Sequence, residues 1–328
     1  MIDLLKISDT RIKHRKNTDK EGLRLLYDLI INAGGQEING YIPLPGSVGL
    51  GYVKSFELEK GLKASVHQVT LNDDLLLKRN ATPNDSETLF IAFNVFNKSA
   101  DTYRKAISSV QITSNNINFT NFLPGRIPVF TLAISLEKSL LVNWFKDLKE
   151  EVPQLLTTNR PVVLDTPLTP EIRRLLTDFV LPGKNPFLPA FFYKIKIQEL
   201  LYWLFRELNT WRKPVHFLHG SDVEKIYRVR DLLLSLPEKL PDLRGLSQEV
   251  NISEAKLKIV FKQIFGTSTY AFYQLARMEE AARLLLHHSV SEVGYQMGFS
   301  NLSHFARLFR KHHGITPKKF QSVKIETA

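Results

Sequence analysis

The chain of 328 residues contains no cysteine. This absence excludes disulfide bonds, thiolate zinc sites, iron–sulfur ligation by cysteine and any cysteine nucleophile. It also fits a reducing compartment, where disulfides rarely persist. We therefore expect a cytoplasmic protein that is held together by buried apolar side chains.

Long apolar runs are also missing. The start of the chain, Met1–Lys20, is charged and has no apolar core of the signal-peptide kind. The longest apolar runs, such as Val129–Ile134 and Leu284–Leu286, fall far short of the roughly 20 residues that cross a bilayer. With 43% hydrophobic and 23% charged residues, the composition is that of a globular protein without a membrane segment. Its length predicts two domains.

Acidic residues are too few to balance the basic ones. The chain has 33 Asp and Glu against 44 Lys and Arg, a formal net charge of +11. The segment Lys256–Lys319 holds ten Lys and Arg against three Glu, a net charge of +7 in fewer than a fifth of the residues. Such an excess favours a polyanionic partner, and the alternative is a solvated basic face.

The first part of the chain has the pattern of strands. Between Tyr41 and Leu136, short runs rich in β-branched and aromatic residues are separated by turn signals. The runs are Gly51–Val53, Leu62–Leu71, Leu89–Val95 and Val129–Leu136. This spacing predicts a small sheet or barrel. A helix is expected before it, over Asp19–Asn32.

A helical period replaces this pattern from about Ser139. Thr169 and Pro170 mark a helix start, with the threonine as cap and the proline in the first turn. A strongly apolar helix is expected over Phe187–Leu208. Its apolar side chains have two interpretations, a buried core helix or a helix at a dimer interface.

The segment 209–220 breaks the periodicity and is interpreted as a linker. The predicted division is a first domain over residues 1–208 and a second over 221–328. Ser221 is expected to open the second domain's first helix, with Glu224 in position for a capping box.

The last third of the chain contains an internal repeat, and its two copies are 48 residues apart. Asn251–Gly266 aligns with Phe299–Gly314. The matched positions are the caps Ser253/Asn301, the core residues Leu257/Phe305, Val260/Leu308 and Phe261/Phe309, the basic residues Lys262/Arg310 and the closing glycines Gly266/Gly314. Each copy predicts a capped helix with one apolar face that ends at a left-handed glycine.

A short helix is expected ahead of each copy, over Leu243–Val250 and Ser291–Met297. Asn251 and Gly298, both residue types that tolerate positive φ, would form the turns. Helix, tight turn and capped second helix make a helix-turn-helix unit, in which the second helix enters the major groove of DNA. A longer helix over Tyr270–His287 would join the two units. Its expected inward residues are Leu275, Met278, Ala282, Leu285 and Leu286.

A last helix would follow the second copy, with Thr316 as cap and Pro317 at its first position. From about Asp222 to Val323, the chain resembles the DNA-binding domain of the AraC/XylS family of transcription regulators. The match is closest over Gly298–Phe320. The departures from the family pattern are Asn251 for the common turn glycine, and Ser247 and Gly294 for the usual alanines.

The resemblance implies an α+β protein, with an N-terminal β-rich, cupin-like sensor domain with flanking helices and a C-terminal all-α domain with two helix-turn-helix units. It also implies which residues meet DNA. Base-edge contacts fall on Ala255, Lys258, Ile259, Leu302, Ser303, Ala306 and Arg307. Phosphate contacts fall on Lys262, Arg310, Lys311, Lys318 and Lys319. Arg307 is the expected bidentate guanine reader, and the two sites would lie about 10–10.5 base pairs apart.

The first domain is expected to be the input domain. Leu58–Leu62 and Arg126–Leu136 resemble regulators of siderophore uptake, so the expected effector is a ferric siderophore or another small anionic metabolite. The family also implies a homodimer and RNA polymerase as a partner. Activation is preferred over repression because most of the family activates.

Enzymatic chemistry finds little support. Cupin metal centres usually take two or three histidines, and this region offers only His67. The pairs His287–His288 and His312–His313 lie near expected helix ends and favour solvent or phosphate over a metal. The glycines of Gly46–Gly51 are in the wrong order for a dinucleotide loop. We therefore expect no cofactor, no metal and no catalysis. The alternative is a cupin-type enzyme or sugar-binding barrel with a DNA-binding tail.

Overall fold

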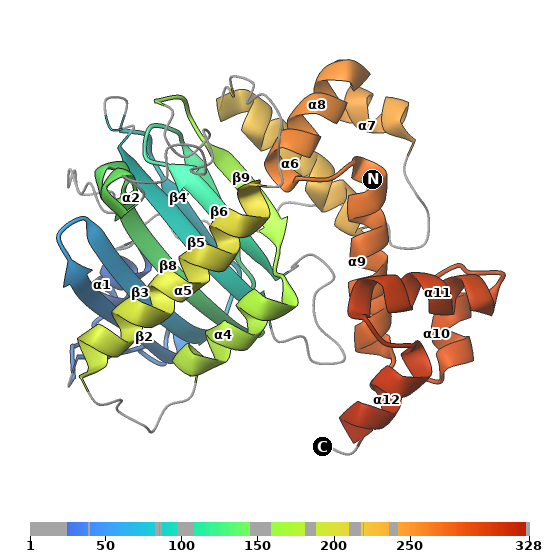
Figure 1. Cartoon of the computed structure of the whole chain (residues 1–328), viewed down its shortest axis with the longest axis horizontal. Helices are drawn as coiled ribbons and strands as arrows, with labels where there is room; N and C mark the ends of the chain where they lie inside the picture. The colour runs from blue at the N-terminus through green and yellow to red at the C-terminus, as the bar shows by residue number, and fades with distance from the viewer. Residues whose placement is uncertain are drawn as a thin grey trace.

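A computed structural model gives the architecture of the chain (Figure 1). The structure describes residues 25–38, 40–82, 85, 87–96, 108–144, 159–180, 188–209, 218, 220–235 and 242–325. A β-rich N-terminal region is followed by a helical C-terminal region, so the predicted α+β class is confirmed. None of the described helices is long and apolar enough to cross a membrane.

A seven-stranded antiparallel sheet forms the centre of the N-terminal region. Its strand order is β1-β2-β3-β8-β5-β6-β9, and β4 pairs with β7 in a separate ribbon. The strands are β1 Ile42–Pro43, β2 Gly49–Glu59, β3 Leu62–Leu71, β4 Leu75–Arg79, β5 Thr88–Phe96, β6 Ser109–Ser114, β7 Phe119–Leu123, β8 Pro128–Glu137 and β9 Val163–Pro167.

The two faces of this sheet differ in chemistry because side chains alternate along each strand. One face is apolar: Val66, Leu132 and Phe93 are neighbours across three strands and are fully or nearly buried. The opposite face carries buried polar side chains from the positions in between. These are Ser65, His67, Asn94, Ser109, Gln111, Thr113, Thr131 and Asp165.

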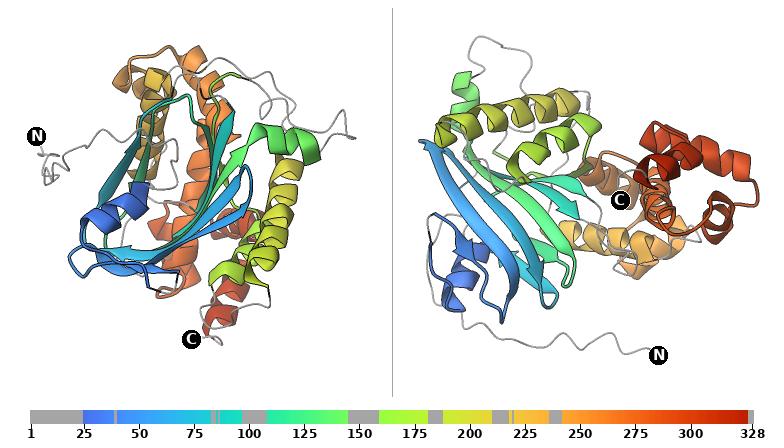
Figure 2. Two further views of the ribbon diagram at one scale, coloured as in Figure 1. Left: turned by 90° about the vertical axis from the view of Figure 1, so that its left-hand side faces the viewer. Right: turned by 90° about the horizontal axis from the view of Figure 1, so that it is seen from below.

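Helices cover the apolar face. They are α2 Lys138–Trp144, α4 Pro170–Val180 and α5 Pro189–Asn209. Ile197, Leu200 and Leu204 of α5 are completely buried in the main core. The short helix α1, Leu25–Asn32, lies on the other side of the sheet from α5 and contacts β4 (Figure 2). The polar face is therefore enclosed rather than left to solvent.

Most predicted elements of this region are present. Leu62–Leu71 is a strand over the expected bounds, and the other three runs lie within β2, β5 and β8. Thr169 caps α4, since its Oγ1 accepts from the Ile172 N–H at 3.4 Å. The strand β9 was missed, because the chain after Ser139 was expected to be helical. Of the expected helix 19–32, residues 19–24 lie outside the described residues.

The C-terminal region consists of seven helices among the described residues. They are α6 Gly220–Ser235, α7 Leu243–Glu249, α8 Glu254–Phe265, α9 Thr269–Leu284, α10 Val290–Gln296, α11 Leu302–His313 and α12 Pro317–Ile325. Two apolar clusters hold them. The first joins α6, α7, α8 and the start of α9, and the second joins the end of α9 to α10, α11 and α12.

Two details of the helix predictions are wrong. The helix α6 begins at Gly220, so Ser221 lies in its first turn and is not its cap. Leu286, expected to face inward, lies beyond the end of α9 and is 42% exposed. The remaining inward residues of α9, Leu275, Met278, Ala282 and Leu285, are buried or half-buried.

Candidate nucleic-acid interface

The first helix-turn-helix unit is α7, a tight turn and α8. Asn251 takes φ 52° in the turn, which is the left-handed conformation expected there. Ser253 then caps α8 by accepting from the Lys256 N–H at 3.3 Å. Gly266, at φ 70°, ends the helix. Each of these local signals acts as the sequence predicts.

The inward face of α8 is made of Leu257, Val260, Phe261 and Ile264, all buried. The opposite face is open to solvent. Ala255, Lys258, Ile259 and Lys262 are all exposed on it, and Ile259 is 46% exposed. An apolar side chain held in solvent between two lysines suits contact with a thymine methyl beside phosphates. Neither lysine forms an ion pair with a described residue, whereas Lys256, outside this face, pairs with Asp222 at 2.8 Å.

The second unit, α10, a turn and α11, is built in the same way and has more capping hydrogen bonds than the first. Ser289 and Glu292 form a capping box at α10. Gly298 takes φ 74° in the turn. Asn301 then caps α11 by accepting from the N–H groups of Ser303 at 2.9 Å and His304 at 3.1 Å.

Glycine at position 294 lets these two helices approach closely. A Cβ built there would lie 2.4 Å from Leu302 Cδ2 and 3.3 Å from the ring of Phe305. This departure from the family's alanine therefore accompanies close contact between α10 and α11. It also explains why Leu302, expected to meet bases, is only half-exposed.

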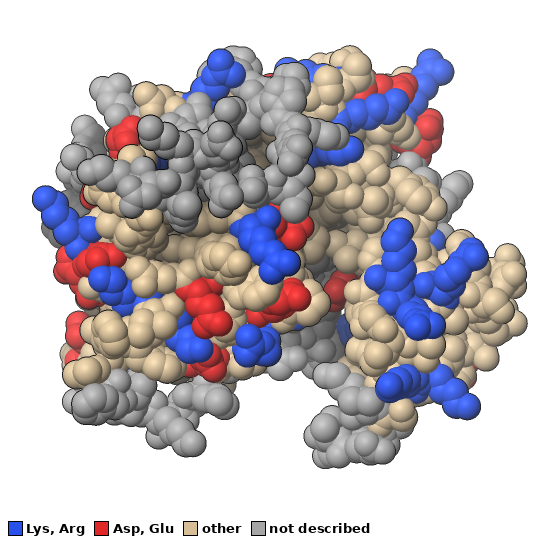
Figure 3. All heavy atoms as spheres, viewed as in Figure 1, with Lys and Arg blue, Asp and Glu red and all other residues tan. Residues whose placement is uncertain are grey.

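The other expected DNA contacts of the second unit lie on its solvent side. Ser303 and Arg307 are exposed and Ala306 is half-exposed on α11. The expected phosphate contacts Arg310, Lys311, Lys318 and Lys319 are exposed at the end of α11 and the start of α12. Lys and Arg gather over α11 and α12 in Figure 3, while acidic and basic side chains mix over the sheet region.

Two arginines between Lys256 and Lys319 do not belong to the exposed basic surface of α8, α11 and α12. Arg277 is buried, donates to the Met297 carbonyl oxygen and lies over the Phe299 ring at 4.3 Å. Arg283 pairs with the buried Glu280 at 2.7 Å. Arg277 thus connects α9 to the second turn and Arg283 pairs within α9, so the exposed basic side chains lie mainly on α8, α11 and α12.

Comparison with known proteins agrees with this geometry. A family model described as a helix-turn-helix domain matches residues 246–322. The transcriptional activator AggR of Escherichia coli is 33% identical over 128 residues, 38% of this chain and 48% of AggR. The DNA-binding dual transcriptional regulator Rns of Escherichia coli is 48% identical over 127 residues, 38% of this chain and 47% of Rns. In its C-terminal part, the chain is similar to the AraC family of transcription regulators, and we call the helices α6 to α12 the AraC-type region.

The regulatory protein PchR of Pseudomonas aeruginosa is 37% identical over 65 residues, 20% of this chain and 22% of PchR. The chain thus spans about half or less of the length of these curated relatives. The AraC-type region accounts for the matches, and the sheet region in front of it is described from its own geometry.

The AraC-type region is docked on the sheet through its first unit. The helix α8 packs on β9, and Ile117 and Val163 of the sheet region join the first apolar cluster of the helices (Figure 1). Tyr227 of α6 meets the Phe119 ring edge-on at 5.8 Å. The second unit packs on α9 instead. The two units therefore differ in their attachment to the rest of the chain.

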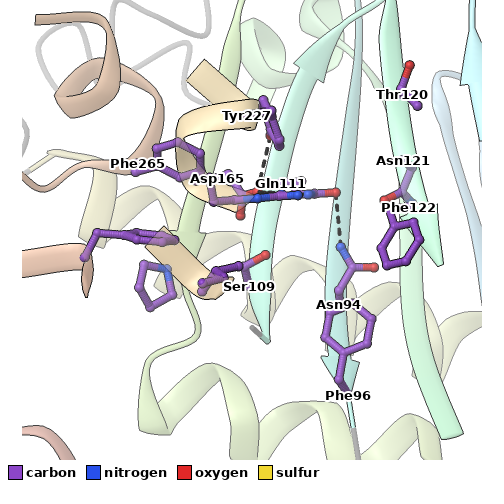
Figure 4. Close-up of a pocket in the computed structure, with 14 residues that line it drawn as sticks. Asn94, Phe96, Ser109, Gln111, Thr120, Asn121, Phe122, Asp165, Tyr227 and Phe265 are labelled. Carbon is purple, nitrogen blue, oxygen red and sulfur yellow. Dashed lines mark hydrogen bonds and ion pairs between the residues drawn. The ribbon is translucent and has the colours of Figure 1, made fainter. Parts of the chain in front are cut away.

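A row of hydrogen bonds crosses the polar face of the sheet and ends on α6. Thr131 donates to Asn94 at 2.8 Å, Asn94 to Gln111 at 3.2 Å, and Gln111 to Asp165 at 2.9 Å. Asp165 Oδ2 also accepts from the Tyr227 hydroxyl at 3.2 Å and faces Arg230 Nη1 at 3.6 Å. We call these residues the polar row; Figure 4 shows its end at Asp165 and Tyr227.

Two cavities lie along the polar row. The interdomain cavity, about 50 Å³, lies between the sheet and α6, and its lining includes Gln111, Asp165, Arg230 and Phe265 (Figure 4). The sheet cavity, about 90 Å³, lies further along the polar face, and its lining includes His67, Arg79, Gln111 and Thr131. Gln111 lines both cavities. Among the described residues, no cluster of three or more His, Asp or Glu could hold a metal ion.

Burial sets the ionisation of two groups on this face. It lowers the pKa of His67 to about 4, and Ser65 is the imidazole's hydrogen-bond partner at 2.9 Å. Burial, together with the neighbouring charge of Asp165, raises the pKa of the Tyr227 hydroxyl well above its usual value. At neutral pH both groups are therefore uncharged.

Sequence reasoning noted His67 and missed Arg79, Asp165, Tyr227 and Arg230. A signal for Asp165 exists, because an aspartate in the otherwise apolar run Val162–Leu164 is costly to bury without a partner. The partners lie 62 and 65 residues later in the chain. No local pattern connects them.

Proposed function

We propose that this protein is a sequence-specific DNA-binding transcription regulator, and a ligand-responsive activator that acts together with RNA polymerase. The observation that carries the proposal is the pair of capped helices α8 and α11, each with an exposed basic face. The relatives are named as transcription regulators, which supports the same class. A chromosomal target would place the protein in the cytoplasm.

In this proposal α8 and α11 each read one stretch of major groove. Ala255, Lys258 and Ile259 contact base edges in the first stretch. In the second, the contacts come from Leu302, Ser303, Ala306 and Arg307. Lys262, Arg310, Lys311, Lys318 and Lys319 bind phosphates, which adds affinity without sequence information. Because α9 is a continuous helix between the units, the two stretches lie about one helical turn of DNA apart.

Residues 1–208 act as the sensor and dimerisation domain, 209–220 as the linker and 221–328 as the DNA-binding domain. The polar row supports a sensing role, since it joins the sheet cavity to α6 of the DNA-binding domain. A ligand in the sheet region would therefore be able to change how the first unit is held.

Self-association is assigned to the outer side of α5. Phe191, Ile195 and Tyr202 of α5 are 61%, 46% and 61% exposed and follow one another at spacings of four and seven residues, and Leu188, 57% exposed, lies just before the helix. That spacing is the apolar seam of a two-stranded coiled coil. The inner side of α5 is core, and the proposed dimer contact is assigned to its outer side.

The dimer is tested by sedimentation of the full chain. Ile195→Glu places a charge in the seam and is expected to give a monomer at concentrations where the parent chain is a dimer. Glu171→Lys, on the exposed surface of α4, is the control and should leave the dimer intact. Equal association of the parent chain and Ile195→Glu would contradict this assignment.

The DNA-binding function is tested by selecting bound sequences from random duplex DNA with the full chain at two salt concentrations. The expected result is two short enriched blocks about one helical turn apart, with total binding weaker at high salt because phosphate contacts release counterions. Selection of no sequence above background at either salt concentration would contradict the proposal.

A further inference from the structure

The sheet cavity contains an arginine that forms no ion pair with a described residue. Arg79, on β4, donates through Nη2 to Thr113 Oγ1 and to the Ser114 carbonyl oxygen, both at 2.9 Å. Its guanidinium lies over the Phe90 ring, 4.3 Å from the ring centroid. Its Nε is buried and has no hydrogen-bond partner. No carboxylate of the described residues lies within ion-pair distance of this group.

The remaining lining of the cavity does not neutralise this charge. His67 is buried beside it with a pKa of about 4, so the imidazole is uncharged at neutral pH. Burial lowers the pKa of Arg79 to about 10 and the charge of Asp85 partly opposes this shift, so the guanidinium stays protonated at neutral pH. The other lining side chains are apolar or neutral. They include Leu77, Ile91, Ala92, Phe119, Leu123, Ala133, Gln111 and Thr131.

Arg79 is half-buried, and a charge removed in part from water without an ion-pair partner is costly to keep. Binding an opposite charge recovers part of that cost. The volume of about 90 Å³ has room for roughly six to nine water molecules. It thus suits a ligand of fewer than about ten heavy atoms. The apolar walls favour a ligand whose remaining atoms are hydrocarbon.

We propose that the sheet cavity binds a small organic monoanion, with a carboxylate on Arg79 and an apolar body against the surrounding leucine and phenylalanine side chains. This inference rests on the proposed function, because it names the chemical class of the effector. A planar guanidinium matches a carboxylate in geometry, and the Nε–H of Arg79 has no hydrogen-bond partner among the described residues.

The same cavity begins the route to the DNA-binding domain. Thr131 and Gln111 line it, and both belong to the polar row that ends on Tyr227 of α6. A bound carboxylate competes for the donors around Gln111. The hydrogen bond from Gln111 to Asp165 then changes, and with it the contact of Asp165 with Tyr227 and Arg230 of α6. The first helix-turn-helix unit, which packs on β9, is the part of the reader that senses this change.

The test is calorimetric titration of the full chain, without DNA, at pH 7.5. The probes are hexanoate and benzoate, their neutral isosteres hexanamide and benzamide, and inorganic sulfate. At least one carboxylate is expected to bind saturably, and its amide should bind at least about tenfold more weakly because it loses a charge-assisted hydrogen bond. Sulfate, which lacks an apolar body, should bind no better than the amide.

Two variants assign the binding to Arg79. Arg79→Gln should abolish carboxylate binding, and Lys78→Gln, the exposed neighbour on β4, should leave it unchanged. If Arg79→Gln does not fold, Arg79→Lys keeps the charge but not the planar fork, and it should bind the carboxylate with reduced affinity. The circular dichroism spectrum reports whether each variant is folded.

Any of three results would overturn the inference: no binding of either carboxylate by the parent chain, equal binding of carboxylate and amide, or unchanged affinity when Arg79 is replaced. Because no DNA is present, these failures leave the sequence selection untouched. Carboxylate binding in a chain that selects no DNA sequence would overturn the proposed function alone.

Discussion

At the scale of single residues, the proposed function divides the exposed side chains of α8, α11 and α12 into those that contact bases and those that contact phosphates. Arg307 and Lys319 represent the two. Both are exposed, and neither forms an ion pair with a described residue. Arg307 lies on α11, six residues after its cap Asn301, whereas Lys319 lies on α12, outside the helix proposed to enter the groove.

Arg307→Ala is expected to weaken binding to the selected sequence by about 1–3 kcal/mol and to relax preference at one base pair. Lys319→Ala should weaken selected and random DNA by equal factors and reduce the salt dependence by about one phosphate contact. Fluorescence anisotropy with both DNAs at several salt concentrations measures these effects. Parallel losses on both DNAs in both variants would refute the division.

His67 gives the sheet region a pH dependence. Its folded pKa of about 4 lies below the ordinary value of 6.5, so the unfolded chain binds the proton first. Stability is therefore complete above about pH 6.5 and falls as the pH drops toward 4. At pH 5 the loss assigned to this group is about 2 kcal/mol.

Urea unfolding of the parent chain and His67→Gln at pH 7.5 and pH 5.0 measures this loss. The variant, which cannot charge, should lose about 2 kcal/mol less than the parent between the two pH values. Carboxylates titrate equally in both proteins, so they cancel in this comparison. Identical losses would show that His67 is not held neutral by burial.

At the scale of elements, the helix-turn-helix units depend on two turns with positive φ. Gly298 takes φ 74° and Asn251 takes φ 52°. Gly298→Ala is expected to cost about 1–2 kcal/mol, because a Cβ clashes in the left-handed region. Asn251→Gly should change stability by less than about 1 kcal/mol, since both residues accept this conformation.

Urea unfolding of the two turn variants tests this expectation. A neutral Gly298→Ala would mean that the second turn is not left-handed. A loss for Asn251→Gly as large as that for Gly298→Ala would mean that the Asn251 side chain, rather than its backbone conformation, maintains the first turn.

The helices of the two units could be predicted because their signals are local. Ser253, Asn301, Gly266 and Gly314 act within a few residues of themselves, and each does what its residue type suggests. The strands β4, β6, β7 and β9 were not assigned from the sequence, because short strands are specified by their neighbours in the sheet. Gly294 shows the same limit, since its contact with Leu302 follows from helix packing and not from helix propensity.

At the scale of the whole molecule, Asp165 connects the sheet to the AraC-type region. It accepts from Gln111 and Tyr227 and faces Arg230. Asp165→Asn keeps its size and removes its charge, so we expect a loss of about 1–2 kcal/mol in the stability of the full chain. Arg230 keeps its pair with Asp231 at 2.8 Å, which limits the effect.

Urea unfolding of the full chain measures this loss. Asp178→Asn is the control, because this carboxylate is partly exposed on α4 and pairs with Lys196 at 2.9 Å. It should change stability by less than about 1 kcal/mol. Equal losses of stability in the two variants would show that Asp165 does not stabilise the contact between the sheet and the AraC-type region. This contact was beyond prediction, because its partners come from distant parts of the sequence.

The central claim is that one molecule reads two adjacent turns of DNA with two units held apart by α9. The most direct test compares the affinity of the full chain for its selected sequence with the affinity for the same sequence carrying five extra base pairs between the two blocks. About half a helical turn is added, so one block rotates to the far side of the duplex. The account predicts affinity no better than that for a single block. Unchanged affinity would contradict it.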